Sequence, residues 1–402
     1  MSAEFIAPRL KRVRPSPTAA VADRVRALQL QGIAVISLGQ GELDFDTPDY
    51  IKQAGIEAIQ HGETKYTAVG GSAALKSAII GKFSRDNDLV YRPEEIIAGT
   101  GAKQLIFNAL LATLSEGQQV IIPAPYWVSY PDMVALADGK AITVPCLEQD
   151  GWKLTPAALK AAITPKTRWL ILNSPSNPTG ALYSRQELEA LAAVLLDAPQ
   201  VLVLADDIYE PLCYDGEVFA TLAQAEPLLK QRTLTVNGLS KSFSMTGWRL
   251  GYAGGPAWLI GAMEILQSQS TSNPSTISQA AGIAALKQPA PFLPGWLMQL
   301  TNRRRRVMSL IEQVAGLSAA TPPAAFYIFV NCKDLIGKRT AGGKLIDSDQ
   351  ALADYLVEQG QVATLPGSAF GMPGYLRIAY AIDDQLLDIA CQRIAEACRA
   401  LK

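Results

Sequence analysis

Three side chains that could support Schiff-base chemistry follow short apolar runs of the sequence. Asp206 and Tyr209 follow the run at residues 201–204, and Lys241 follows the run at residues 233–236. A lysine just beyond a buried strand is partly desolvated, which lowers its pKa and prepares the amine to react with a carbonyl group. A carboxylate at the end of a neighbouring strand can hold a protonated ring nitrogen. Together these residues predict a site for a carbonyl-bearing cofactor.

A glycine turn at residues 99–101 supplies a candidate phosphate site, because it precedes a predicted helix whose free N–H groups and dipole favour an anion. A dinucleotide fingerprint would need a third glycine where Gln104 stands, and its acidic residue would end a strand, whereas Glu116 falls at the end of a helix. The turn therefore favours a phosphate monoester over a pyrophosphate. With the lysine and the carboxylate described above, it predicts pyridoxal phosphate.

The apolar runs predict the strands that position these residues. Apart from Thr233-Leu234-Thr235-Val236, the runs do not alternate polar and apolar residues, which is typical of strands buried on both faces of a parallel sheet. Helical patterns lie between them at residues 102–115 and 185–196, and another begins at Thr47-Pro48 and ends at Gly62. This alternation predicts an α/β fold, with ligands at the carboxyl ends of the strands. The runs are residues 95–98, 120–122, 169–172, 201–204, 233–236 and, more weakly, 250–253.

We expect a second, smaller domain that is built from both ends of the chain, because the strand–helix rhythm stops there. A helical pattern near residues 298–316 precedes an apolar segment at residues 326–330. The four arginines at residues 303–306 are expected on an exposed face of that helix, in surface or intersubunit ion pairs. The predicted division is a large domain at residues 49–299 and a small domain formed by residues 1–48 and 300–402.

The composition of the 402-residue chain excludes several kinds of site. His61 is the only histidine, so a serine triad could be built only there, and a site with several histidine ligands cannot be built. The net charge of −1 disfavours a nucleic-acid or membrane-surface protein. The five cysteines lack CxxC spacing, and the sequence has neither a membrane-length apolar run nor a signal-peptide pattern. We therefore expect reduced thiols and a cytoplasmic protein.

Six segments of the chain resemble, in order, sequence blocks of the class I pyridoxal-phosphate-dependent aminotransferases. The resemblance extends over nearly the whole chain and is closest to the bacterial aspartate aminotransferase branch, which includes aspartate/prephenate enzymes. It implies fold type I, with a mostly parallel sheet flanked by helices in a large domain and a smaller α+β domain. The segments are GETKYT (62–67), PYWVSYPDM (125–133), NSPSNPTG (173–180), DDIYE (206–210), GLSKSFSMTGWRLG (238–251) and Phe326-Tyr327.

The resemblance also implies which residues contact the cofactor ring. Lys241 would bond the cofactor covalently and later move the substrate proton, and Asp206 would keep the ring nitrogen protonated. Tyr209 and Asn177 would bond the ring hydroxyl oxygen. Trp127 would stack on the ring and line the substrate side.

For the cofactor phosphate, the resemblance implies Arg249 and the N–H groups of Gly101, Ala102 and Lys103. Tyr66 would reach the phosphate bound by a neighbouring subunit. That contact requires a homodimer with shared active sites.

The implied substrate contacts favour an amino acid with two carboxylates. Arg377 would hold the α-carboxylate as a bidentate fork, helped by the Gly41 backbone and Asn177. Lys103 and Thr18 stand where this branch reads a distal carboxylate. The expected reaction is ping-pong transamination between aspartate or glutamate and a 2-oxo acid such as 2-oxoglutarate or oxaloacetate.

Other activities remain open at this point. The same fold serves aminotransferases of prephenate, aromatic amino acids or alanine, as well as pyridoxal-phosphate lyases and cyclases. Arg12 and Arg14 could meet a second carboxylate, as in prephenate, although we expect a solvated N-terminal arm there. A regulatory protein that keeps the fold and, more distantly, a nicotinamide dehydrogenase are the remaining alternatives.

Three residues depart from the family pattern. Leu43 stands where proline is usual, Asp207 replaces the commoner glutamate, and Gly238 stands where many members have a phosphate-binding serine. We also predict a cis peptide bond at Asn177-Pro178, since such bonds cluster in tight turns at functional sites.

Overall fold

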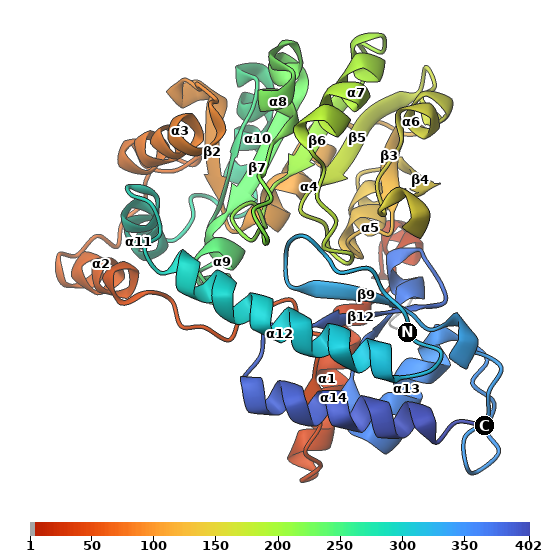
Figure 1. Ribbon diagram of the computed structural model, residues 1–402. Helices are drawn as coiled ribbons and strands as arrows, with labels where there is room; N and C mark the ends of the chain where they lie inside the picture. The colour runs from red at the N-terminus through yellow and green to blue at the C-terminus, as the bar shows by residue number, and fades with distance from the viewer. Residues whose placement is uncertain (1–4) are drawn as a thin grey trace.

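A computed structural model describes residues 5–402 and contains a seven-stranded sheet (Figure 1). The strand order is β2-β8-β7-β6-β5-β3-β4, and every neighbouring pair is parallel except the two that include β8. The prediction of an α/β fold with a mostly parallel sheet is confirmed. The strands are β2 (Ile96–Gly99), β3 (Gln119–Ala124), β4 (Lys140–Pro145), β5 (Thr167–Asn173), β6 (Leu202–Asp206), β7 (Thr233–Gly238) and β8 (Gly251–Gly254).

Helices cover both faces of this sheet. In β5, Trp169 and Ile171 pack into one hydrophobic core while Leu170 and Leu172 pack into another, because successive side chains of a strand point to opposite faces. This two-sided burial explains the unbroken apolar runs. The helices around the sheet are α2 (Asp49–Gln60), α3 (Ala73–Asn87), α4 (Ala102–Thr113), α5 (Ser129–Leu136), α6 (Pro156–Ala162), α7 (Arg185–Leu196), α8 (Leu222–Ala225), α9 (Leu239–Ser242), α10 (Ala257–Ser268) and α11 (Thr276–Leu286).

Strand β4 is absent from the sequence prediction. It lies at the edge of the sheet, and none of its six residues is fully buried. A strand with one partner needs no continuous apolar run, so the criterion that found the central strands passes over it.

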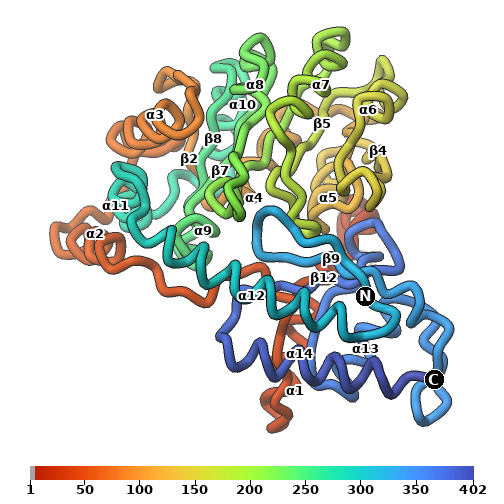
Figure 2. Tube along the Cα trace, in the orientation of Figure 1, coloured from red at the N-terminus to blue at the C-terminus, as the bar shows by residue number. Residues whose placement is uncertain are grey.

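A smaller antiparallel sheet, ordered β11-β12-β9, is built from the C-terminal third of the chain. The N-terminal segment joins this region, because β1 (Ile36–Ser37) pairs with β10 (Val362–Ala363) and α1 (Pro17–Leu30) lies beside α13 (Figure 2). The boundaries at residues 49 and 300 stay a prediction. The further elements are α12 (Leu293–Gln313), β9 (Tyr327–Asn331), α13 (Asp349–Gly360), β11 (Leu365–Pro366), β12 (Tyr375–Ala379) and α14 (Asp384–Arg399).

Two of the arginines predicted at a surface are in fact buried inside the chain. Arg303 and Arg304 in α12 are 4% and 3% exposed. Arg303 forms a bidentate pair with Asp44 at 2.6 and 2.9 Å, and Arg304 donates to Asp215 at 2.6 Å. The prediction was wrong because overall charge balance says nothing about which arginines have buried partners.

The boundary of α2 also differs by one residue from the prediction. The helix begins at Asp49 with Pro48 as its N-cap, and the Thr47 hydroxyl donates to the Ser244 carbonyl at 2.8 Å instead of capping the helix. His61 is the C-cap residue, followed by Gly62 with a φ of +72°.

Across residues 5–402, no helix is long and apolar enough to cross a membrane. The same residues contain no cluster of three or more histidine, cysteine or acidic side chains that could hold a metal ion. All five cysteines are free.

Candidate active site

A cavity of about 470 Å³ opens where strands β5, β6 and β7 end and the smaller sheet begins. Asn173 and Asp206 are the last residues of β5 and β6, Lys241 lies in α9 directly after β7, and Arg377 comes from β12. The cavity therefore collects chemistry-bearing side chains from both sheets. Its lining includes Thr18, Gly39, Gly41, Glu42, Ala102, Lys103, Trp127, Tyr130, Asn173, Asn177, Asp206, Tyr209, Lys241, Thr246, Arg249, Tyr327 and Arg377.

Lys241 is held in a setting that favours its neutral amine. Burial lowers the pKa of Lys241 to about 8, and the charges of Arg377 and Arg249 act in the same direction, against the opposing effect of Glu42 and Asp206. Its Nζ donates to the Gly41 carbonyl across the cavity. A lysine with this pKa is a nucleophile and a base near neutral pH.

Asp206 has one bonded and one free carboxylate oxygen. Its Oδ2 accepts a hydrogen bond from the Tyr130 hydroxyl at 2.6 Å, whereas its buried Oδ1 has no partner among the described residues. Burial raises the pKa of Asp206 to about 6, although the Tyr130 bond and Lys241 oppose this shift. A buried oxygen without a donor fits a ligand that brings an N–H group.

Tyr209 and Asn177 reach the cavity through a chain of contacts that links both sheets. The hydroxyl oxygens of Tyr209 and Tyr327 are 2.7 Å apart. The backbone N–H of Asn177 donates to Asn173 Oδ1 at 2.8 Å, and Asn173 Nδ2 donates to the Asp206 carbonyl at 2.8 Å. Asn173 thus fixes the loop that bears Asn177 against the strand that bears Asp206. The peptide bond between Asn177 and Pro178 is cis, as predicted.

The turn before α4 forms a cradle for an anion. Gly101 has a φ of +93°, and a Cβ at this position would meet Arg249 Nη2 at 2.6 Å, so only glycine fits. Arg249 Nη1 is held by the Thr246 carbonyl at 2.9 Å. The first N–H groups of α4, from Ala102 and Lys103, have no acceptor within the helix. A guanidinium and a helix N-terminus converge here, as phosphate binding requires.

Arg377 is the most deeply buried cation of the cavity, at 1% exposure. Its Nη1 donates to Asn177 Oδ1 at 2.8 Å and its Nη2 to the Gly39 carbonyl at 2.5 Å, while the buried Nε has no acceptor in the described structure. The guanidinium lies 4.6 Å from the Tyr327 ring centre. A buried cation with spare donors is suited to a carboxylate ligand.

Lys103 places a second cation in the cavity. Its Nζ lies 4.8 Å from the centre of the Trp127 ring, which is itself perpendicular to Tyr130 at 5.2 Å. Burial and the nearby Arg249 lower the pKa of Lys103. The Thr18 hydroxyl also lines the cavity and bonds the Ser16 hydroxyl at 2.8 Å.

Among the predicted site residues, all of which the structure describes, only Tyr66 lies outside both the cavity and the Gly101 turn next to it. Its side chain is 89% exposed and does not line the cavity. All the other predicted site residues, apart from Gly101 in the turn beneath Arg249, line the cavity itself.

Four contributors to the cavity were not singled out from the sequence. Tyr130, Asn173 and Tyr327 lie inside the resembling blocks, so their presence there was the available signal, but only the fold shows which atoms they contact. Glu42 accepts a hydrogen bond from the Thr246 hydroxyl at the edge of the cavity. Nothing in the spacing of Glu42 indicates that contact.

The residues fit the cofactor that the resemblance implies. The unpartnered Oδ1 of Asp206 is matched by a protonated ring nitrogen, the Gly101 cradle by a phosphate, and the neutralised Lys241 amine by an aldehyde. A flat ring also has an aromatic neighbour in Trp127.

The sequence and the fold both match known proteins. The family model described as aminotransferase class I and II matches residues 33–394. The chain is 51% identical over 397 residues to an aspartate/prephenate aminotransferase of Cereibacter sphaeroides, with 99% of each chain covered. It is 49% identical over 395 residues to an aspartate aminotransferase of Rhizobium meliloti, with 98% of this chain and 96% of the relative covered.

Two solved structures share the whole architecture. The aspartate aminotransferase of Rhizobium meliloti superposes with a TM-score of 0.96 at 49% identity and covers 99% of each chain. The aspartate aminotransferase of Thermus thermophilus with maleate gives a TM-score of 0.90 at 37% identity, covering 98% of this chain and 99% of the other.

Proposed function

The chain belongs to the class I and II aminotransferase family, and on that premise we propose that it transfers the amino group of aspartate or glutamate to a 2-oxo acid by a ping-pong mechanism. The observation that carries the substrate class is that two of the four cations lining the cavity, Arg377 and Lys103, remain when Lys241 and Arg249 are assigned to the cofactor. Arg377 offers a buried donor without a partner, and Lys103 supplies a second positive charge. Two cations that remain for the substrate suit a molecule with two carboxylates.

The proposed cofactor is pyridoxal phosphate. Asp206 would hold its ring nitrogen, Tyr209 and Asn177 its ring oxygen, and Arg249 with the start of α4 its phosphate. When bound, the cofactor supplies an electron sink that stabilises negative charge at the substrate Cα. Trp127 would cover the ring and exclude water from that side.

Lys241 would carry the protons of the reaction. Its Nζ is buried and has a pKa of about 8, so roughly a tenth to a fifth of the amine is neutral between about pH 7 and 7.4, and this fraction can accept the proton from the substrate Cα. The single histidine, His61, lies at the end of α2 and outside the cavity, so no histidine competes for this role. Asp206, held by Tyr130, supplies the negative charge that balances the cationic groups around it.

Arg377 would orient the substrate. The Nη1 and Nη2 donors are fixed by Asn177 and the Gly39 carbonyl, which leaves the guanidinium in one orientation toward the cavity. Holding the α-carboxylate there presents the Cα–H bond to Lys241, and fixed orientation of this kind contributes much of an enzyme's rate. Lys103 and Thr18 would hold the distal carboxylate.

Prephenate is the second candidate, because the Cereibacter sphaeroides relative is named for it. In this chain Arg12 pairs with Asp138 at 2.7 Å, which holds the N-terminal arm against the end of α5. Both side chains are about half exposed, so this surface pair is weak and leaves Arg12 able to meet a second carboxylate. We rank aspartate and glutamate first because the Rhizobium meliloti and Thermus thermophilus relatives are named for aspartate. Prephenate comes next, and aromatic amino acids and alanine follow it.

We further propose a homodimer in which Tyr66 reaches the phosphate site of the partner subunit, in agreement with its 89% exposure in the single chain. The two domains would be residues 49–299 and residues 1–48 with 300–402. The free cysteines agree with a cytoplasmic location.

The test is a comparison of wild type with Lys241→Ala after incubation with pyridoxal phosphate. Wild type should gain an absorbance band near the visible edge. It should form more than one equivalent of 2-oxo acid per site from aspartate only when a 2-oxo acid acceptor is added. Lys241→Ala should lose both, whereas Lys166→Ala, at an exposed position, should keep both. Formation of more than one equivalent of 2-oxo acid per site without an acceptor would indicate a lyase and overturn the proposal.

A further inference from the structure

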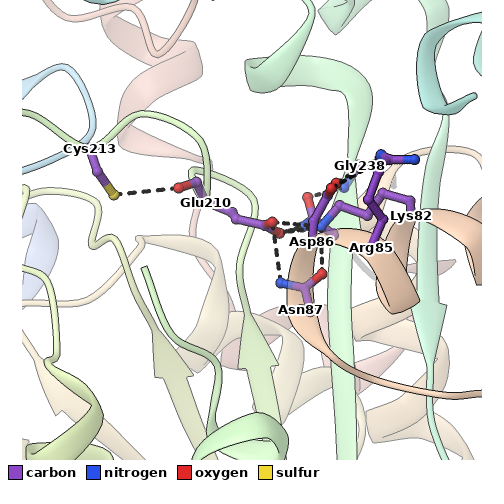
Figure 3. A network of polar contacts seen from close by, with 8 residues as sticks. Lys82, Arg85, Asp86, Asn87, Glu210, Cys213 and Gly238 are labelled. Carbon is purple, nitrogen blue, oxygen red and sulfur yellow. Dashed lines mark hydrogen bonds and ion pairs between the residues drawn. The ribbon is translucent and has the colours of Figure 1, made fainter. Parts of the chain in front are cut away.

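Behind the cavity, the buried carboxylate of Glu210 accepts four hydrogen bonds (Figure 3). Glu210 accepts from Lys82 Nζ at 2.7 and 2.5 Å, from Asn87 Nδ2 at 3.2 Å and from Asn237 Nδ2 at 2.6 Å. Lys82 and Asn87 belong to α3, and Lys82 Nζ also donates to Asn87 Oδ1 at 2.7 Å. None of these four residues is more than 9% exposed.

The Glu210–Asn237 hydrogen bond joins the two segments that bear the reactive groups. Glu210 directly follows Tyr209 in the turn after β6, and its N–H donates to the Asp207 carbonyl at 2.9 Å. Asn237 lies near the end of β7, and its Oδ1 accepts from the Gly238 N–H at 2.7 Å, where the chain enters α9 and reaches Lys241. One carboxylate oxygen therefore ties the turn of Tyr209 to the start of the helix that carries Lys241.

The ion pair with Lys82 offsets the free-energy cost of burying the Glu210 carboxylate. A carboxylate at this depth would be strongly destabilising without a paired cation and full hydrogen bonding. Lys82 supplies the charge, and Asn87 and Asn237 occupy the remaining acceptor positions. The other titratable or charged groups near Glu210 are Asp207 and Cys213 in its own segment, Tyr252 in β8, and Arg85 and Asp86 in α3.

We propose that Glu210 is a positioning residue, which sets the separation of Tyr209 and Lys241 through its bond to Asn237. The inference rests on the proposed function, because both of these residues act there on the same bound cofactor. Small displacements of catalytic groups reduce rate strongly, so a fixed link between the two segments has a catalytic purpose beyond stability. Lys82 and Asn87 support Glu210 and touch neither reactive residue.

The test measures the pH midpoint at which the visible band of the cofactor-loaded protein changes. Asn237→Ala removes the link and leaves the Lys82–Glu210 ion pair intact. We expect its midpoint to move by about 0.5 pH unit or more, with kcat about tenfold lower and KM for aspartate within about twofold of wild type. Glu210→Ala/Lys82→Met removes the link from the other side together with both charges, and should shift the midpoint equally.

Two controls separate positioning from stability. Glu210→Gln/Lys82→Met removes both charges but keeps an oxygen that can accept from Asn237, so its midpoint should stay at the wild-type value. Asp215→Asn removes the partner of buried Arg304 far from the link, and should lose stability without moving the midpoint. An unchanged midpoint in Asn237→Ala, or failure of both link variants to fold, would overturn the inference. Absence of the band in wild type would instead contradict the proposed function.

Discussion

The hydroxyl oxygens of Tyr209 and Tyr327 lie 2.7 Å apart, and the two residues come from different sheets. Tyr209 follows β6 of the large sheet, while Tyr327 opens β9 of the small one and packs its ring 4.6 Å from the Arg377 guanidinium. The contact therefore connects the proposed cofactor residue with the proposed substrate arginine. Both residues line the cavity between the two sheets, where the substrate is proposed to bind.

Tyr327→Phe tests this connection. The variant keeps the ring against Arg377 but removes the oxygen that bonds Tyr209, and a buried neutral hydrogen bond contributes about 1 kcal/mol. We expect kcat/KM for aspartate to fall about fivefold to tenfold. The free energy of unfolding should fall by about 1 kcal/mol. Steady-state kinetics and urea unfolding would measure the two effects. Kinetics equal to wild type would mean that the two hydroxyl groups do not act together.

Asp206 gives the cofactor-free protein a specific pH dependence. Burial raises its pKa from 3.8 to about 6, so between these values the unfolded chain is ionised while the folded one still holds the proton. The Asp206 contribution to the free energy of unfolding should therefore fall by about 2 kcal/mol as pH rises from about 4 to about 6. Asp206→Asn lacks this loss, so its stability relative to wild type should increase across that window.

Urea unfolding of the cofactor-free wild type and variant at several pH values would measure the difference. A constant difference from pH 4 to pH 7 would contradict the raised pKa of Asp206. Asp384→Asn is a useful contrast, because the pKa of Asp384 is lowered by its bond to Arg303. Its stability relative to wild type should show no such increase.

Lys241 should take up pyridoxal phosphate with a pH dependence of its own. Only the neutral amine is a nucleophile, and burial lowers the pKa of Lys241 to about 8. We expect the rate of cofactor incorporation into the cofactor-free protein to rise with pH and level off above about pH 8. Stopped-flow absorbance would follow the reaction. A rate that continues to rise to pH 10 would indicate an ordinary, solvated lysine.

Lys103→Met tests whether Lys103 binds the distal carboxylate of the substrate. Loss of a charged hydrogen bond is expected to lower kcat/KM for aspartate by about tenfold to a hundredfold, because Lys103 is the cavity cation proposed to bind the distal carboxylate. Alanine has no distal carboxylate, so its kcat/KM should change little. Lys103→Arg keeps the charge and should retain the preference for aspartate. An equal decrease in kcat/KM for aspartate and alanine would mean that Lys103 contacts only the cofactor and not the substrate.

The sequence predicted those parts of the fold and the site that depend on local pattern. Two-sided burial produces predominantly buried runs with few charges, which revealed β5, β6 and β7, and the residues just after them led to Asp206 and Lys241. Strand β4 was not predicted, because an edge strand with partly exposed residues has no such run.

Long-range partners could not be read from the chain in the same way. Tyr130 and Asp206 are 76 positions apart, and Lys82 and Glu210 are 128 positions apart. The burial of Arg303 and Arg304 was missed because their acidic partners lie in distant segments. Such pairs are fixed by tertiary packing, and a single sequence carries no periodic signal for them.

The most direct test of the account is a half-reaction survey of the cofactor-loaded protein without any acceptor. Aspartate and glutamate should each abolish the visible band and release one equivalent of the matching 2-oxo acid per site, and Arg377→Ala should fail to respond at the same concentrations. A band that resists aspartate and glutamate but is lost with alanine or an aromatic amino acid would contradict the proposed substrate class. Release of more than one equivalent would contradict transamination itself.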